Sequence, residues 1–298
     1  MDRLTESLRT IASARVWAVV ILAALVAGCG DPSSLDRQME ARRLSSELLV
    51  QFGRATDAAN MAVMAGHDET STGFAREAEQ AALAVQRDAD ALKPLLSGLG
   101  YTGESRLLEE FIGRFAEYRE LDHVIRGLAV ENTNLKAQRL SFGPAQQEAD
   151  AFREALESIA RSSPPREAWQ VKALTAIALS AVREIQVLQG PHIAEAEDAA
   201  MTRLEEQMAS SAASARGALQ TLAGVLPPAS KPHLAAAATA LDRFDDLNGQ
   251  LIALSRRNSN VRALALSMGE KRKLTARCEE SLNALQEALR KRSFTGTR

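Results

Sequence analysis

The amino-acid sequence predicts an all-α protein, an antiparallel helical bundle built from two repeated four-helix modules. Its 298 residues are 46% hydrophobic but only 4% aromatic, so alanine and leucine must form most of the core. This mixture suits close-packed helices, because strands favour aromatic and β-branched side chains. Apolar residues also recur every three or four positions, as on one buried helix face. The first such stripe comprises Ala41, Leu44, Leu48, Phe52, Ala55, Ala59 and Ala62.

Glycine and proline mark the ends of the expected helices. Gly143-Pro144 combines a helix stop with a proline suited to a first turn, and Pro164-Pro165 and Pro227-Pro228 act similarly. Pro94 is expected to kink the second helix or to end it early. The expected helices span residues 34–65, 69–97, 104–142, 144–161, 165–189, 194–225, 230–267 and 270–292.

An internal repeat divides the chain. Residues 132–143 read NTNLKAQRLSFG and residues 258–269 read NSNVRALALSMG, an offset of 126 positions. Apolar positions upstream of each copy also match at this offset, so chance does not explain the similarity. The repeat predicts two helical-bundle modules of four helices each, residues 35–162 and 163–293.

The N-terminus predicts export. Three arginines within residues 1–15 precede the apolar stretch 16–28, which is too short for a comfortable membrane span. The small residues before Cys29 resemble the lipobox of bacterial lipoproteins, whose cysteine is acylated. Residues 1–28 are therefore expected to be a signal peptide, Cys29 the lipidation site and residues 29–34 a tether. This resemblance implies a periplasmic protein held on a membrane by its lipid, and the residue after Cys29, which is not aspartate, favours the outer membrane. An uncleaved signal anchor is the alternative.

Charge and motifs exclude several functions. The chain has 36 Lys and Arg against 38 Asp and Glu and no long basic block, so nucleic acid is not an expected partner. The sequence GLGYTG at residues 98–103 lacks the βαβ context of a dinucleotide site, and Glu120 with His123 lacks the second pair that a di-iron bundle needs. No nucleophile elbow, P-loop or HExxH motif occurs. We expect no enzyme activity, no cofactor and no metal.

Two asparagines are the candidate site. Asn132 and Asn258 occupy the same place on an apolar helix stripe in the two copies, and Lys136 and Arg262 follow one turn later. A buried amide costs free energy unless it is hydrogen-bonded. One interpretation is that both asparagines set helix register, as in coiled coils. The other is a polar pocket in which Asn132, Lys136, Asn258 and Arg262 bind a small anion such as a carboxylate. Contact with a partner protein is a third.

Three features are similar to the periplasmic sensor domains of bacterial chemotaxis receptors. They are the N-terminal membrane-targeting segment, the helix end AANMAVMAG at residues 58–66 and the long helix that ends in NTNLKAQRLSFG. The resemblance implies a helical bundle that binds amino acids or organic acids between helices, often near a dimer interface. Such receptors continue into a second membrane span, whereas this sequence ends in the polar and basic ALRKRSFTGTR.

The expected function is therefore a detached, non-enzymatic sensor-like module that binds a small ligand or an envelope partner. The alternative is a structural envelope lipoprotein that acts through helix–helix contacts and has no small ligand. A homodimer is compatible with both.

Overall fold

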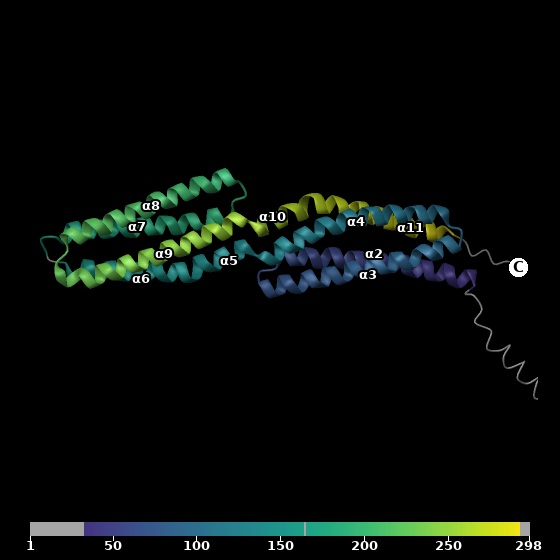
Figure 1. Cartoon of the computed structure of the whole chain (residues 1–298), viewed down its shortest axis with the longest axis horizontal. Coiled ribbons are helices and arrows are strands. Elements are labelled where there is room, and N and C mark those ends of the chain that lie inside the picture. The colour runs from purple at the N-terminus through teal and green to yellow at the C-terminus, as the bar shows by residue number, and fades with distance from the viewer. Residues whose placement is uncertain (1–32, 164, 293–298) are drawn as a thin grey trace, which may run out of the picture. The chain divides into compact units, whose positions relative to one another are not determined.

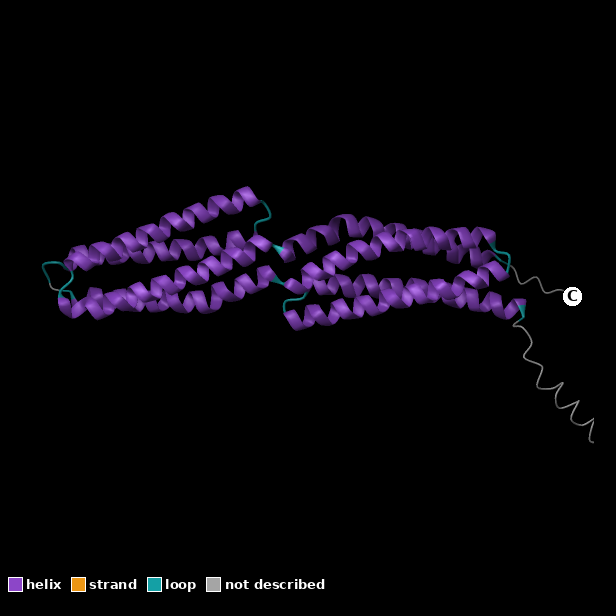
Figure 2. Cartoon of the chain, in the orientation of Figure 1, coloured by secondary structure: helices purple, strands orange, loops and turns teal. Residues whose placement is uncertain are grey.

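The computed structural model describes residues 33–163 and 165–292, and in these residues every regular element is a helix (Figure 2). If α4 to α6 and α9 to α11 are each counted as one interrupted helix, six long helices of the described chain pack antiparallel. The all-α prediction is confirmed. The predicted signal peptide and Cys29 lie outside the described residues. No helix within the described ranges is long and apolar enough to cross a membrane.

The helices follow one another with short connections (Figure 1). The α-helices are α2 (Ser34–Met64), α3 (Asp68–Gly98), α4 (Thr102–Glu131), α5 (Thr133–Leu140), α6 (Gln146–Ser162), α7 (Ala168–Ala194), α8 (Asp198–Val225), α9 (Lys231–Arg257), α10 (Ser259–Leu266) and α11 (Arg272–Lys291). Two π-helices, η1 (Ser141–Ala145) and η3 (Ser267–Lys271), and a 3₁₀-helix, η2 (Pro228–Ser230), complete the set.

The expected helix ends need four corrections. The helix stop expected at Gly143-Pro144 does not occur, because Pro144 lies inside η1, which continues α5 directly into α6, and η3 likewise continues α10 into α11. The helices expected over 104–142 and 230–267 are each interrupted, at Asn132 and at Asn258. Pro94 does not end α3, which continues to Gly98. Pro191 lies inside α7, which continues to Ala194, although the helix expected from residue 165 ends at residue 189. A proline removes one backbone hydrogen bond of a helix but does not always end it. Pro94 and Pro191 are therefore poorer signals of a helix end in this chain than Asn132 and Asn258.

The described residues form two compact units. The first comprises residues 33–51, 84–112 and 279–292. Arg292 anchors it: its guanidinium donates to both carboxylate oxygens of Glu104, at 2.6 and 2.7 Å. The carbonyl of Arg292 accepts hydrogen bonds from Arg42 and Gln38. These contacts hold the end of α11 against the beginnings of α2 and α4.

The second unit comprises residues 52–83 and 113–278. In it α7 packs against α8, and α9 packs against both α5 and α6. The centre of this packing is made of large apolar side chains surrounded by many alanines, as the composition predicts. Its large side chains include Phe152, Leu156, Ile185, Leu222 and Phe244. The consecutive modules 35–162 and 163–293 remain a prediction, because compactness alone does not test a repeat.

Candidate functional site

Asn132 and Asn258 interrupt their helices by the same backbone conformation. Asn132 has φ 50° and ψ 39°, and Asn258 has φ 52° and ψ 36°. They are the non-glycine residues with positive φ in the described chain. Asparagine adopts this left-handed conformation more readily than most residues. The expectation of a continuous helix through these positions is therefore wrong, while their expected burial is confirmed, at 0% and 6% exposure.

The residues after each break cap the opposite helix. The backbone N–H of Thr133 donates to Oγ of Ser259, and the N–H of Ser259 donates to Oγ1 of Thr133, both at 3.0 Å. The N–H of Asn134 donates to Oδ1 of Asn260, and the N–H of Asn260 donates to Oδ1 of Asn134, both at 3.1 Å. The first N–H groups of a helix have no partner within it. Here α5 and α10, which lie side by side (Figure 1), supply each other's partners.

Side-chain amides complete this junction, which consists of residues 132–134 and 258–260. Asn134 donates through Nδ2 to Oδ1 of Asn258, and Asn260 donates through Nδ2 to Oδ1 of Asn132, both at 2.9 Å. Asn134 also donates to the carbonyl of Ile193 at 2.6 Å. The amides of Asn134, Asn258 and Asn260 and the side-chain oxygen of Asn132 thus bind across the repeat, which reduces the cost of burying these polar groups.

The two cations of the predicted anion site do not join the junction. Lys136 donates through Nζ to the carbonyl of Glu131 at 2.8 Å and lies 4.0 Å from a carboxylate oxygen of Asp68. Arg262 is exposed, and its backbone N–H donates to the carbonyl of Asn258. The structure therefore brings Asn132 and Asn258 together without Lys136 and Arg262. Anion binding by these four residues stays a prediction, and the hydrogen bonding favours the register interpretation.

The repeat motif has a local structural counterpart. In both copies a left-handed asparagine precedes an eight-residue α-helix and a five-residue π-helix. The π-helices begin at Ser141 and Ser267, again 126 positions apart. Phe142 and Met268 occupy the same place in them and are 80% and 64% exposed. Short π-helices occur often at functional sites, so the surfaces beside η1 and η3 are candidates for binding.

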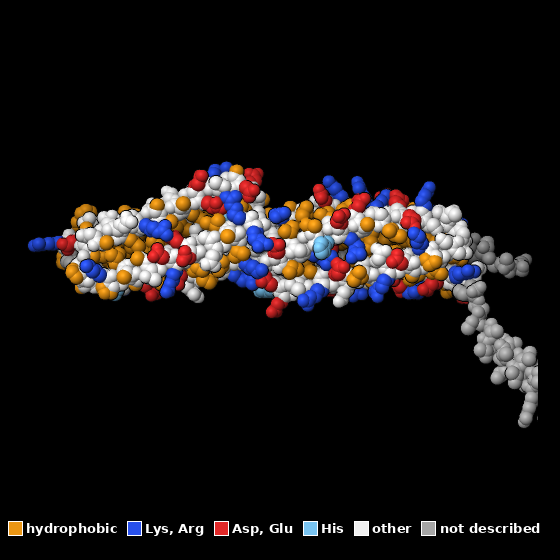
Figure 3. All heavy atoms as spheres, viewed as in Figure 1, with side chains coloured by type: hydrophobic (Ala, Val, Ile, Leu, Met, Phe, Trp, Pro, Cys, Tyr) orange, Lys and Arg blue, Asp and Glu red, His pale blue; other side chains and the backbone are white. Residues whose placement is uncertain are grey.

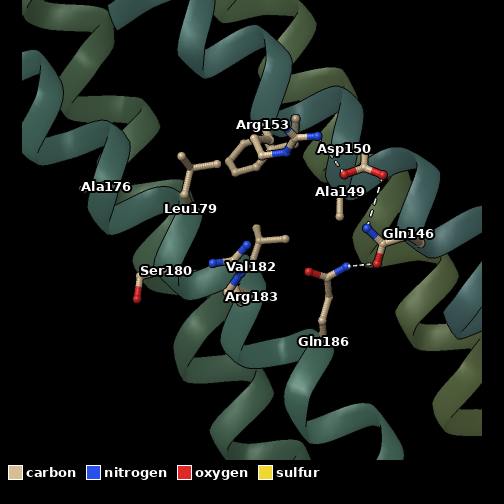
Figure 4. A pocket seen from close by; sticks show the side chains of 11 residues that line it. Gln146, Ala149, Asp150, Arg153, Ala176, Leu179, Ser180, Val182, Arg183 and Gln186 are labelled. Carbon is tan, nitrogen blue, oxygen red and sulfur yellow. Dashed lines mark hydrogen bonds and ion pairs between the residues drawn. The ribbon is translucent and has the colours of Figure 1, made fainter.

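A cleft of about 460 Å³ lies between α6 and α7 (Figure 4). Its apolar lining includes Ala149, Phe152, Leu179 and Val182. Polar residues from both helices line the rest. They are Gln146, Asp150, Arg153, Ser180, Arg183 and Gln186. Pockets of this size with an apolar floor and a few converging polar groups are typical small-molecule sites.

The polar side of this α6–α7 cleft is partly tied together. Gln186 donates to Gln146 at 2.8 Å, Gln146 donates to Asp150 at 3.2 Å, and Arg153 donates to Asp150 at 3.1 Å. The hydrogen bonds from Gln146 and Arg153 lower the pKa of the Asp150 carboxyl. In the described part of the chain, no hydrogen bond or ion pair engages the guanidinium of Arg183. Within the described residues, the guanidinium of Arg183 is thus available to bind a ligand in this cleft.

A buried Ser–His–Glu group lies nearby in the same unit. His192 contacts Oγ of Ser255 through Nδ1 at 2.9 Å and Oε1 of Glu205 through Nε2 at 2.8 Å. A nucleophilic triad has similar contacts. However, His192 and Ser255 are 0% exposed, and Ser255 donates to the carbonyl of His192 at 2.8 Å. A substrate cannot reach this serine, so the group joins α7, α8 and α9 and supplies no nucleophile.

Sequence reasoning missed a buried ion pair. Lys271 and Asp122, each 2% exposed, meet with Nζ 2.9 Å from Oδ1. Arg126 binds the other oxygen of Asp122 at 2.7 Å. Burial lowers the pKa of Lys271, and the nearby Asp122 opposes that effect. The described residues contain no group of His, Cys, Asp and Glu side chains suited to a metal ion.

No protein-family model matches the chain, and no curated protein or solved structure shows significant similarity to it.

Proposed function

We propose that the chain is a non-enzymatic, sensor-like binding module that takes a small organic anion in the α6–α7 cleft. One observation carries the proposal: the guanidinium of Arg183 lines a cleft of about 460 Å³ and has no partner in the described residues. Guanidinium groups bind carboxylates through two parallel hydrogen bonds. The apolar floor of Ala149, Phe152 and Leu179 suits the hydrocarbon part of the same ligand.

The location of this module is proposed from the sequence. The basic residues, the apolar stretch 16–28 and Cys29 support a lipoprotein anchored to a membrane in the bacterial periplasm. The equal offset of the two left-handed asparagines and of the two π-helices supports the two repeated four-helix modules. An alanine-rich helical module beside a membrane is also what the resemblance to chemotaxis-receptor sensor domains implies.

The alternative is a structural envelope lipoprotein that acts through helix–helix contacts. Hydrophobic side chains lie at the surface between charged ones (Figure 3), and three large ones lie on α7. Trp169 is 73% exposed, Ile177 51% and Val187 67%. An apolar helix face of this kind suits a homodimer or an envelope partner.

Titration of the purified full chain with acetate and succinate, followed by thermal unfolding, tests the proposal. A bound anion at one hundred times its dissociation constant adds about 2.7 kcal/mol of stability. We expect Arg183→Ala to weaken binding roughly tenfold, the loss of one good charged contact. The control is Arg203→Ala, which removes an exposed arginine of α8 outside the cleft. If neither anion stabilises the chain, the structural alternative is favoured.

A further inference from the structure

A second cavity of about 310 Å³ lies where the end of α2 faces α10, η3 and the start of α11. We call it the methionine groove, after the apolar side chains Val63, Met64, Leu264 and Met268 that line it. Met64 is 77% exposed, Leu264 50% and Met268 64%. Large apolar side chains that gather at one opening mark binding surfaces, and methionine adapts its shape to different ligands.

The polar side of the groove is built around Lys271. This residue lines the groove although it is 2% exposed, and its Nζ lies 3.4 Å from Oδ1 of Asn60. Ser267 donates to the same oxygen at 3.2 Å. Both donors therefore orient the Asn60 amide. Within the described residues, its Nδ2 makes no hydrogen bond and stays available as a donor.

The charge of the lining is one-sided. Lys271 and Arg272 are cations, and none of the lining residues is a carboxylate. Asp122, which does not line the groove, already forms ion pairs with Lys271 and Arg126. The guanidinium of Arg272 makes no hydrogen bond or ion pair within the described ranges. The groove thus joins an apolar wall to an uncommitted cation, which is complementary to an anion that carries an apolar tail.

We propose that the methionine groove binds a medium-chain carboxylate. Its carboxylate lies against Arg272 and the Asn60 amide, and its hydrocarbon chain packs on Val63, Met64, Leu264 and Met268. This site is separate from the α6–α7 cleft and does not depend on the function proposed there. Each buried methylene adds roughly fourfold in affinity, so tail length controls binding here, whereas the cleft selects a compact anion.

The repeat supplies a matched comparison. Arg272, Thr275 and Asn60 of the groove fall 126 positions from Gln146, Ala149 and Gln186 of the cleft. The groove thus has a cation, Arg272, at the position where the cleft has an amide, Gln146. Phe142, the counterpart of Met268, is exposed but does not line the cleft. Phe142→Glu therefore adds a negative charge to the other π-helix, outside both cavities, and is the matched control for Met268→Glu.

Equilibrium dialysis of the full chain with octanoate, 1-octanol and acetate tests the proposal. We expect octanoate to bind at least roughly tenfold more tightly than octanol or acetate, because only octanoate has both the tail and the charge. Arg272→Ala should weaken octanoate roughly tenfold and leave octanol unchanged. Met268→Glu should weaken octanoate by a similar factor, and Phe142→Glu should leave it unchanged, with circular dichroism confirming that both variants fold.

Equal binding of octanoate and octanol would overturn the proposal, as would octanoate binding that survives Met268→Glu. The Arg183→Ala variant separates the two sites. Octanoate binding that is unchanged in Arg183→Ala but lost in Met268→Glu supports the groove, whatever succinate does. Octanoate binding that is lost in Arg183→Ala assigns the ligand to the cleft and contradicts the groove.

Discussion

Asn134 and Asn260 bind each other by the same contact made twice: the backbone N–H of each donates to the side-chain oxygen of the other, at 3.1 Å. Each residue therefore caps the helix that the other begins. Such a contact ties the two copies of a sequence repeat together at buried positions.

Loss of one capping amide should destabilise the junction strongly. Asn134→Ala removes the acceptor for the Asn260 N–H and the donor to Asn258. Each buried polar group left without a partner costs about 1–3 kcal/mol, so we expect a loss of roughly 3 kcal/mol in urea denaturation. Asn283→Ala, at an exposed position of α11, is the control and should change stability by less than about 0.5 kcal/mol. An equal effect of both substitutions would refute the capping role.

Because the backbone at Asn132 is left-handed, glycine and alanine at this position should give variants of different stability. Both substitutions remove the oxygen that accepts from Asn260, but glycine adopts positive φ without strain. Alanine pays about 1–2 kcal/mol for the left-handed conformation. Asn132→Ala should therefore be less stable than Asn132→Gly by about 1 kcal/mol, measured by denaturant titration of both variants. The order is opposite to that in a continuous helix, so a more stable alanine variant would exclude the break.

The ion pair of the first unit should make stability depend on acid pH. Hydrogen bonds from Arg292 hold the pKa of the Glu104 carboxyl below its usual range, against the effect of burial. Because the folded pKa is lowered, this contribution is complete above the unfolded pKa, about 4.3, and is lost as the pH falls through the folded value.

Comparison with a neutral variant isolates this effect. Glu104→Gln should cost roughly 2 kcal/mol at pH 7. The difference from the native chain should shrink as the pH is lowered below about 4. Unfolding curves of both proteins at pH 7, 5 and 3 measure it. A difference that stays constant over this range would show that the charge of Glu104 contributes nothing.

The buried Lys271–Asp122 pair should also make stability rise with pH, but in an alkaline window instead of an acid one. Burial lowers the pKa of Lys271, so between that value and the unfolded one the unfolded chain binds more protons. Stability therefore rises with pH across this window. Asp122→Asn removes the counter-charge, which costs about 3 kcal/mol at pH 7 when the remaining charge stays buried. Part of that loss should be recovered as the pH is raised toward 10, and denaturation at pH 7 and pH 9.5 tests it.

Periodicity identified the helices and the burial of both asparagines, but not the break in the chain at each. A single left-handed residue leaves the spacing of apolar side chains intact on both sides, so the stripe through Asn132 shows no gap. A signal was present nonetheless. Asparagine followed by Thr133 or Ser259 is typical of a helix start, and two such starts in the middle of two long helices indicate interruptions.

The charged residues of the two cavities were beyond prediction from the sequence. Lys271 and Arg272 are neighbours in the chain, yet one is buried against Asp122 and the other lines an open groove. Arg153 lies on α6 and Arg183 on α7, and only the packing of these two helices shows that both residues line one cleft. Such placement depends on contacts between residues far apart in the sequence, which composition and spacing do not contain.

The mutual capping at the junction also limits how the two copies of the repeat evolve. A side chain that recognises its own counterpart cannot be replaced alone, because the first substitution strands a buried group in the other copy. Positions of the repeat that do not contact their own counterpart differ between the copies: Arg139 corresponds to Ala265, and Phe142 to Met268. The triplets NTN and NSN both have asparagine at their first and third positions. The two triplets thus constrain each other's sequence, and the hydrogen bonds that Asn134 and Asn258 donate to the carbonyls of Ile193 and Glu195 add a second constraint on the same asparagines.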